Sequence, residues 1–376
     1  MIQRILLFII IILTSVVFLE IDPIKEPVDG VVQKEPEEIG VATSTSSISG
    51  PTESKPVAKS TKKSVSQLKP AAPAPTASIQ LQIPTITEVP AEPPTDFETI
   101  NKQVQKAVVN ILCTTGGNTL SPVSGTGIIV SSEGVILTNA HVAEYFLLRD
   151  FHQKDFVQCI IRTDSPAYPR YYAELVYISP TWIENNKTIL KEANPTGTGE
   201  NDFAFLRITS AVDGSPLSKF DYVPLNLREI IDKGDNVVLV SYPAGFLGGI
   251  TIQQNLNIVS AITTVQDFFT FNLNTIDIIS VGGTVVSQKG ASGGAVVDKY
   301  SSVLGIITTS SDGATTADRR LHAITSAYID RAFQSETGIS LTQLLSKDVS
   351  GFAKKFQNSI APVLTKIITD ELTKNQ

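Results

Sequence analysis

Residues 125–142 read GTGIIVSSEGVILTNAHV, and this stretch decides the fold class. Two β-like runs, Gly127–Val130 and Val135–Thr138, flank the turn signal Ser132-Glu133-Gly134, and the second run leads to His141. Short apolar runs joined by a glycine-containing turn are typical of a β-hairpin. The stretch therefore predicts a hairpin that presents a histidine just beyond its second strand.

Similar β-like runs recur on both sides of this hairpin, and turn signals separate many of them. They are Val108–Thr114, Phe156–Thr163, Leu175–Ser179, Phe203–Ile208, Asn236–Ser241, Asn257–Thr263, Ala295–Val297 and Val303–Thr309. Many short strands with few helical patterns predict an all-β fold, a sandwich or a pair of barrels.

Helical periodicity returns only near the end of the chain. Apolar residues recur every three or four positions between Leu341 and Leu372, with a kink expected at Pro362. The first interpretation is an amphipathic extension, residues 336–376, that packs on the domain. The alternative is a helix used for oligomerisation or for a membrane surface, and the pattern does not separate the two.

The composition excludes several functional classes. Lys and Arg number 30 against 37 Asp and Glu, so the net charge is −7 and a basic nucleic-acid footprint is not expected. Two cysteines, Cys113 and Cys159, are too few for a thiolate zinc site or a disulfide-rich scaffold, and whether they form a bridge stays open. With three histidines in the chain, we expect no metal and no cofactor.

Three short segments carry residues suited to nucleophilic catalysis. His141 follows the hairpin, Asp202 opens the run Phe203–Ile208, and Ser292 lies in Gly290-Ala-Ser-Gly-Gly. Taken singly, each has a structural explanation as a strand-end or turn residue. Together they are the set that activates a serine, because a weakly nucleophilic hydroxyl needs a base, and the base needs a partner that fixes its tautomer.

The glycines around the serine predict a second feature. They allow the backbone to turn so that two N–H groups point to one place, as stabilisation of an oxyanion requires. We expect these donors to be the backbone amides of Gly290 and Ser292.

His141, Asp202 and Ser292 follow the chain order of the chymotrypsin-like serine peptidases. Residues from about 108 to 333 resemble this family, and in particular its HtrA-like branch. The resemblance rests on the motifs GTGIIVSSEGVILTNAHV, NDFAFLRI at Asn201, VSYPAG at Val240, NIVSA at Asn257 and GASGGAVV at Gly290. It implies two orthogonal six-stranded antiparallel β-barrels in residues 98–335, with the site between them and a short closing helix near Tyr328–Phe333.

Three departures limit what the resemblance implies. HtrA-like proteins usually carry a PDZ domain after the peptidase domain, and the residues after Phe333 are too few for one. The interval from His141 to Asp202 is long, which predicts an insertion near 185–200. Ala291 stands where the trypsin branch has an aspartate that pairs with a newly cut N-terminus, so we expect no activation by cleavage.

The resemblance also places a substrate pocket. Its walls would include Ser287, Thr308, Ser310 and His322, with Arg320 nearby. Such a polar or cationic pocket suits a polar or acidic side chain better than a basic one.

The N-terminal residues predict a tether. Residues 1–20 hold one cation, Arg4, before the apolar run Ile5–Leu19, which indicates a membrane anchor or, alternatively, a cleaved signal segment. Residues 21–97 contain twelve of the 21 prolines among Ser, Thr, Lys and Glu, a composition typical of a disordered linker. Either interpretation places the catalytic domain outside the cytoplasm, in the periplasm or outside the cell.

The function expected from these residues is a membrane-tethered serine endopeptidase that acts on extracytoplasmic proteins or peptides through an acyl-enzyme. In it Ser292 is the nucleophile, His141 the general base and acid, and Asp202 the residue that orients His141. The alternative is a catalytically silent, peptidase-like module that binds peptides or a partner protein at the cell surface.

Overall fold

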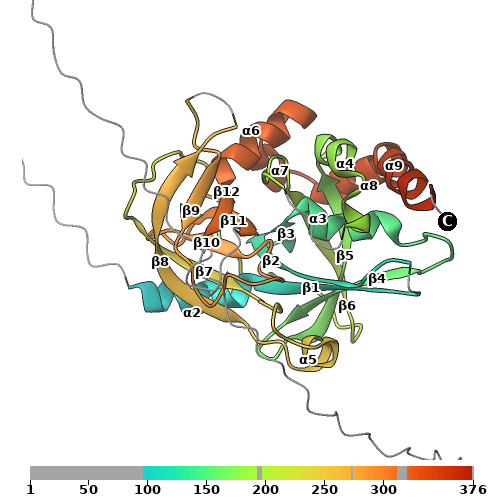
Figure 1. The fold of residues 1–376 in the computed structure, drawn as a ribbon, viewed down its shortest axis with the longest axis horizontal. Coiled ribbons are helices and arrows are strands. Elements are labelled where there is room, and N and C mark those ends of the chain that lie inside the picture. Colours follow the sequence, from blue (N-terminus) through green and yellow to red (C-terminus); the bar gives the residue numbers. More distant parts are fainter. Residues whose placement is uncertain (1–95, 118, 193–196, 272–273, 311–319, 375–376) are drawn as a thin grey trace, which may run out of the picture. The chain divides into compact units, whose positions relative to one another are not determined.

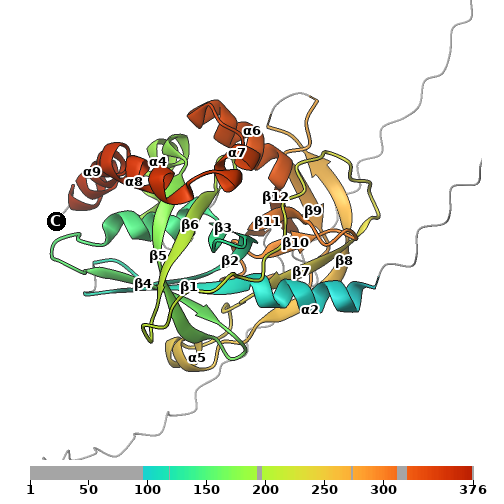
Figure 2. The same ribbon diagram turned by 180° about the vertical axis from the view of Figure 1, so that it is seen from behind.

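The structure is a computed structural model that describes residues 96–374 apart from 118, 193–196, 272–273 and 311–319. Twelve strands in this part of the chain form two closed, antiparallel, six-stranded barrels (Figures 1 and 2). In pairing order, the first barrel contains β1 (Val108–Thr115), β2 (Val123–Ser131), β3 (Val135–Thr138), β6 (Ala204–Ala211), β5 (Tyr168–Ile178) and β4 (Val157–Thr163). The second contains β10 (Ala295–Val297), β11 (Val303–Ser310), β12 (Leu321–Thr325), β9 (Ile278–Val281), β8 (Val259–Phe269) and β7 (Asn236–Ser241). The predicted all-β, two-barrel class is confirmed.

Helices precede, connect and follow these strands. They are α2 (Phe97–Ala107), α3 (Ala140–Ala143), η2 (Glu144–Leu148), α4 (Pro180–Asn186), η3 (Ile189–Lys191), α5 (Gly249–Gln254), α6 (Ser326–Thr337), α7 (Leu341–Ser346), α8 (Val349–Ser359) and α9 (Ala361–Thr373). The insertion predicted near 185–200 contains the end of α4 and all of η3, so part of it is helical.

The hairpin predicted from residues 125–142 forms from β2 and β3. Ile128 pairs with Leu137 and Ile129 with Ile136. Gly134, with a φ of +75°, closes the turn by donating its N–H to Ser131 O at 3.0 Å. A left-handed φ of this kind favours glycine. After β3 the chain enters α3, a single turn that carries His141.

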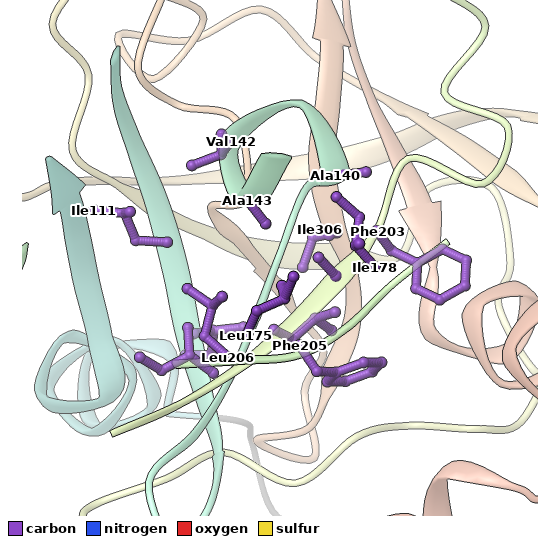
Figure 3. Packing of buried hydrophobic residues seen from close by; sticks show 14 of the residues in the cluster. Ile111, Ala140, Val142, Ala143, Leu175, Ile178, Phe203, Phe205, Leu206 and Ile306 are labelled. Carbon is purple, nitrogen blue, oxygen red and sulfur yellow. The ribbon is translucent and has the colours of Figure 1, made fainter. Parts of the chain in front are cut away.

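The core of the first barrel extends under α3. Ala140, Val142 and Ala143 are buried among strand residues that include Phe205 and Leu206 (Figure 3). The short helix therefore owes its position to tertiary packing, since four residues are too few for a stable isolated helix. The second barrel has a smaller cluster of its own around Leu239, Val265 and Ile279.

A disulfide joins Cys113 of β1 to Cys159 of β4. The two residues are direct cross-strand partners in the first barrel, with their Cα atoms 4.0 Å apart. This settles the pairing that the sequence left open.

The C-terminal extension is three helices rather than one, and it packs on the first barrel (Figure 1). Leu344, Phe356, Leu364 and Ile368 belong to the larger core cluster, which contains the buried strand residues of the first barrel and some of the second. Pro362 lies in the first turn of α9, where its missing N–H costs nothing, and α8 ends just before it at Ser359. The packing interpretation of the apolar stripe is confirmed, whereas oligomerisation through this segment stays a prediction.

At the other end, α2 begins at the last residue of the predicted linker. Asp96 caps the helix by accepting the N–H groups of Glu98 and Thr99, an arrangement that the sequence analysis missed. The predicted anchor, residues 1–20, and linker residues 21–95 lie outside the described residues. Within the described ranges, no helix is long and apolar enough to cross a membrane.

Candidate active site

His141 and Asp202 meet at the end of the first barrel. His141 Nδ1 lies 2.8 Å from Asp202 Oδ2, and the backbone N–H of His141 donates to Oδ1 at 3.0 Å. An ionised carboxylate only accepts hydrogen bonds, so Nδ1 carries the proton and Nε2 keeps its lone pair. This is the tautomer that a general base requires.

Two further groups hold Asp202. Thr308 of β11 donates its hydroxyl to Oδ2 at 2.8 Å, which links the second barrel to the carboxylate. Asn139 donates to the backbone carbonyl of Asp202, also at 2.8 Å. Gly199 makes room for Thr308, because a Cβ on Gly199 would lie 2.8 Å from the Thr308 methyl carbon. Every hydrogen bond to the carboxylate stabilises its ionised form.

The local electrostatics support the same assignment of charge. Burial of His141 opposes its protonation, but the charge of Asp202 and the hydrogen bond to it prevail and raise the pKa of His141 above 6.5. Burial acts to raise the pKa of Asp202, and its bonds to His141 and Thr308 outweigh this and lower it. Burial, with the charge of Asp202, raises the pKa of the neighbouring Glu144 carboxyl well above its ordinary value.

Ser292 lies on a tight loop of the second barrel. The loop begins with a turn in which Ala291 N–H donates to Gln288 O at 3.1 Å, and Gly290 adopts a φ of +90°. A β-turn with a left-handed third residue has the type II pattern and favours glycine there. Any side chain on Gly290 would also meet the backbone N of Ala244 and O of Tyr242 at 2.9 Å.

This turn orients two backbone donors. The carbonyl of Lys289 accepts the N–H of Ala244 at 2.6 Å, and in a trans peptide the following N–H points the opposite way. Among the described residues, neither the N–H of Gly290 nor that of Ser292 donates to an acceptor of the protein. Two uncommitted N–H groups beside a serine hydroxyl form the arrangement expected of an oxyanion hole.

Thr126 of β2 ties this loop to the first barrel. Its hydroxyl donates to Gly290 O at 2.8 Å and accepts Tyr242 N–H at 3.0 Å, while its own N–H donates to Ser292 O at 2.8 Å. Gly293 also fits closely, because a Cβ there would lie 1.9 Å from Thr126 O and 2.5 Å from the hydroxyl of Thr138. Thr138 precedes His141 by three residues, so these contacts bring the serine loop to the histidine segment.

The structure therefore brings the three predicted triad residues to one junction between the barrels. Within the described part of the chain, the Ser292 hydroxyl makes no hydrogen bond to His141. Catalytic hydrogen bonds are often long or poorly aligned without substrate.

Comparison with known proteins identifies one domain. Residues 125–306 match the family model described as the trypsin-like peptidase domain. The chain contains a trypsin-like peptidase domain. The predicted recognition and enzyme class, a serine endopeptidase, are confirmed at this level. No curated protein is significantly similar to the sequence.

Two solved structures resemble the peptidase domain. A serine endoprotease from Yersinia pestis aligns with 21% identity and a TM-score of 0.41 over 65% of this chain and 67% of that chain. An HtrA-type protease solved with a tripeptide aligns with 19% identity and a TM-score of 0.42 over 65% of this chain and 64% of the other. The chain thus spans about two thirds of the length of each.

Of the four predicted pocket residues, the structure describes the side chains of Ser287, Thr308 and His322. Thr308 is buried, and its hydroxyl donates to Asp202. Ser287 is fully buried, and its hydroxyl accepts Thr284 N–H within its own loop. His322 on β12 is half-buried with its ring against Phe269, and the side chain of Ser310 lies outside the described residues. The preference of the peptidase domain for a polar or acidic residue stays a prediction.

Thr126 and Asn139 were missed in the sequence analysis. Each lies inside a quoted motif, Gly125-Thr126-Gly127 and Thr138-Asn139-Ala140, so the signal was present without a role attached. Their partners, Gly290 and Asp202, are distant in sequence. The Thr126 contact forms only where the two barrels dock, and the Asn139 contact only where β3 pairs with β6. Among the described residues, no group of three or more His, Cys, Asp or Glu side chains could hold a metal ion.

Proposed function

We propose that this protein is an extracytoplasmic serine endopeptidase that cleaves proteins or peptides through an acyl-enzyme. The observation that carries the proposal is the pair of uncommitted N–H groups of Gly290 and Ser292, next to a His141 whose tautomer is fixed by Asp202. A binding module has no need of donors directed at the oxygen of a tetrahedral intermediate.

In the proposed reaction, His141 Nε2 accepts the hydroxyl proton of Ser292 while Oγ attacks the scissile carbonyl. The resulting oxyanion accepts hydrogen bonds from Gly290 and Ser292. His141 then gives its proton to the leaving amine, and the acyl group stays on Oγ. A water molecule attacks the acyl-enzyme in the same way, with His141 again as base, and Ser292 is regenerated. Asp202 stabilises the imidazolium at both stages.

The proposed location rests on the sequence alone. The apolar run Ile5–Leu19 after Arg4 supports an N-terminal membrane segment, and the proline-rich residues 21–95 support a flexible tether. The proposed site of action is therefore the periplasm or the cell exterior, next to the membrane, and the proposed substrates are extracytoplasmic proteins.

Substitution Ser292→Ala tests the proposal. The full-length protein should cleave an unfolded protein such as casein and react with a fluorophosphonate, whereas Ser292→Ala should lose about 10⁶-fold in kcat and all labelling. A Ser302→Ala variant is the control, because Ser302 lies in the turn before β11 and outside the site. Parental cleavage by Ser292→Ala would show that Ser292 is not the nucleophile. A parent that binds casein without cleaving or labelling would favour the silent binding module.

A further inference from the structure

Asn201, the residue before Asp202, has an unusual backbone conformation. Its φ is +57°, in the left-handed region that non-glycine residues seldom adopt. It is the third residue of a turn that Asp202 closes by donating its N–H to Gly199 O at 3.2 Å. The φ of Asn201 sets the direction in which Asp202 leaves the turn. A group that fixes the conformation of Asn201 therefore also orients the carboxylate of Asp202.

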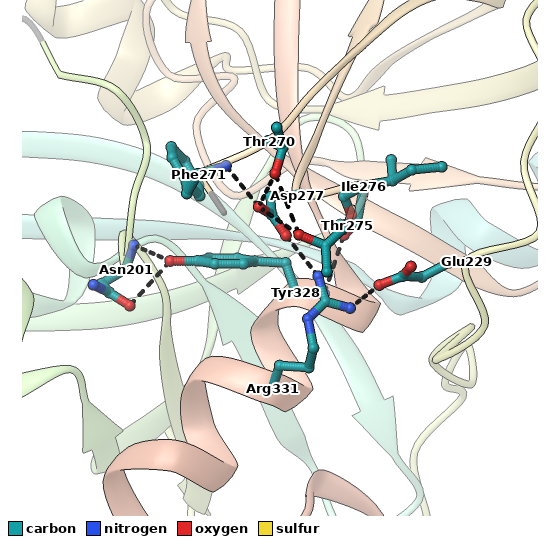
Figure 4. A network of polar contacts seen from close by, with 10 residues as sticks. Asn201, Glu229, Thr270, Phe271, Thr275, Ile276, Asp277, Tyr328 and Arg331 are labelled. Carbon is teal, nitrogen blue, oxygen red and sulfur yellow. Dashed lines mark hydrogen bonds and ion pairs between the residues drawn. The ribbon is translucent and has the colours of Figure 1, made fainter. Parts of the chain in front are cut away.

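The hydroxyl group of Tyr328 on α6 holds Asn201 (Figure 4). The backbone N–H of Asn201 donates to the Tyr328 hydroxyl at 3.1 Å, and the same hydroxyl donates to Asn201 Oδ1 at 3.1 Å. The hydroxyl thus closes a ring with the main chain and the side chain of one residue. Tyr328 is 6% exposed, so water has little access to compete for these bonds.

The helix that carries Tyr328 is itself fixed at two points. Thr325 caps its first turn by accepting the N–H of Tyr328 at 3.1 Å. One turn further, Arg331 donates to the buried carboxylate of Asp277 at 2.6 Å and also pairs with Glu229 (Figure 4). Asp277 accepts the N–H of Phe271 as well. Tyr328 is therefore presented to Asn201 from a helix anchored in the second barrel.

We propose that Tyr328 is a positioning residue for the triad, which acts by holding Asn201 and through it the carboxylate of Asp202. The inference rests on the proposed function. Two hydrogen bonds then attach the triad to the second barrel. Thr308 donates to the Asp202 carboxylate, and Tyr328 accepts the N–H of Asn201, the residue before it. Neither residue touches the reacting atoms.

Replacement Tyr328→Phe removes only the hydroxyl and tests the role. We expect kcat to fall about tenfold, as for the loss of a hydrogen bond that orients a catalytic group, with KM unchanged. A carboxylate that is less well oriented stabilises the His141 imidazolium less and so lowers the pKa of His141. The acid limb of the kcat/KM profile should therefore move to lower pH. Tyr145→Phe is the matched control, because Tyr145 is 7% exposed and its hydroxyl donates to Ser121 O at 2.9 Å, outside the triad.

A cycle with Asn201→Gly separates positioning from general loss of stability. Glycine tolerates the left-handed φ and keeps the backbone donor, but it removes the Oδ1 acceptor. If Tyr328 acts through Asn201, Tyr328→Phe should cost at least about threefold less in the Asn201→Gly background than in the parent. Equal costs in both backgrounds would overturn the inference, and this comparison remains valid if either single variant is less stable.

The remaining outcomes are distinct. An active parent with Tyr328→Phe unchanged in kcat and pH profile, or changed no more than Tyr145→Phe, overturns the inference alone. A parent that neither cleaves casein nor reacts with the fluorophosphonate overturns the proposed function, and the inference with it.

Discussion

The two halves of the site differ in how their polar groups are used. In the His141–Asp202 half, the carboxylate accepts three hydrogen bonds and the residue before it is held by Tyr328. In the Ser292 half, the loop is fixed through its carbonyls and through the N–H groups of Ala291 and Gly293, while the N–H groups of Gly290 and Ser292 are left uncommitted. The first half holds its carboxylate with hydrogen bonds and the second keeps donors for a ligand, as expected if the first maintains a charge and the second receives one.

In the His141–Asp202 half, replacement Asp202→Asn should lower kcat the most. An amide places an N–H where the carboxylate accepts, so His141 would adopt the wrong tautomer and kcat should fall by roughly 10⁴-fold. Steady-state kinetics would measure the loss. Asp298→Asn is the control, because Asp298 is a buried carboxylate in a turn of the second barrel that binds Tyr300 N–H and Ser302 N–H. Comparable losses in both variants would contradict the special role of Asp202.

The pH profile of the same variant sharpens the comparison. In the parent, activity requires neutral His141, and Asp202 raises its pKa above 6.5, so kcat/KM should rise with pH through a value above 6.5. Without the carboxylate charge, the acid limb should move to lower pH. An acid limb at the same pH in both proteins would show that another group controls it.

In the Ser292 half, replacement Gly290→Ala should remove an oxyanion donor. The added Cβ cannot fit between Ala244 N and Tyr242 O at a φ of +90°, so the turn must change and its N–H must swing away. Loss of one oxyanion donor lowers kcat by about 10²- to 10³-fold. Gly214→Ala provides the control, since Gly214 has a φ of +75° with open space around its Cβ position. It should lose about 1 kcal/mol of stability and no activity.

Replacement Thr308→Val should have the smallest effect, because it removes one of the three bonds to the carboxylate and keeps the volume. We expect kcat to fall about tenfold, since the pKa of Asp202 then rises toward its ordinary value and the carboxylate is less firmly held. Thr115→Val, which removes a hydroxyl bonded to Leu120 O in the first barrel, is the control. A wild-type rate for Thr308→Val would limit the role of Thr308 to packing.

The strands that could be predicted are those whose sequence contains a continuous apolar run. Asn236–Ser241 and Val135–Thr138 were predicted with the bounds that the structure gives them. Ile278–Val281 and Leu321–Thr325 were missed, because each is short and interrupted by polar residues such as Ser280 and His322. These two strands pair with each other, so their extended conformation depends on a distant partner that local pattern does not reveal.

The candidate site divides in the same way. The residue types of the triad and the turn glycines are visible in local motifs, and the structure brings them together. The roles of Thr126, Thr308 and Tyr328 could not be predicted, because each is defined by a partner in the opposite half of the domain. The sequence names the reacting groups, and the docking of the barrels determines what holds them.

The close fit of Gly293 has a consequence for comparing distant sequences. The space where its first side-chain atom would go is already filled by the carbonyl oxygen of Thr126, so alanine is excluded for purely steric reasons. A homologue with any other residue at this position must therefore have a wider gap between its two halves, whether or not its serine is intact. Position 293 is thus a marker of geometry that can be checked in a sequence before any assay.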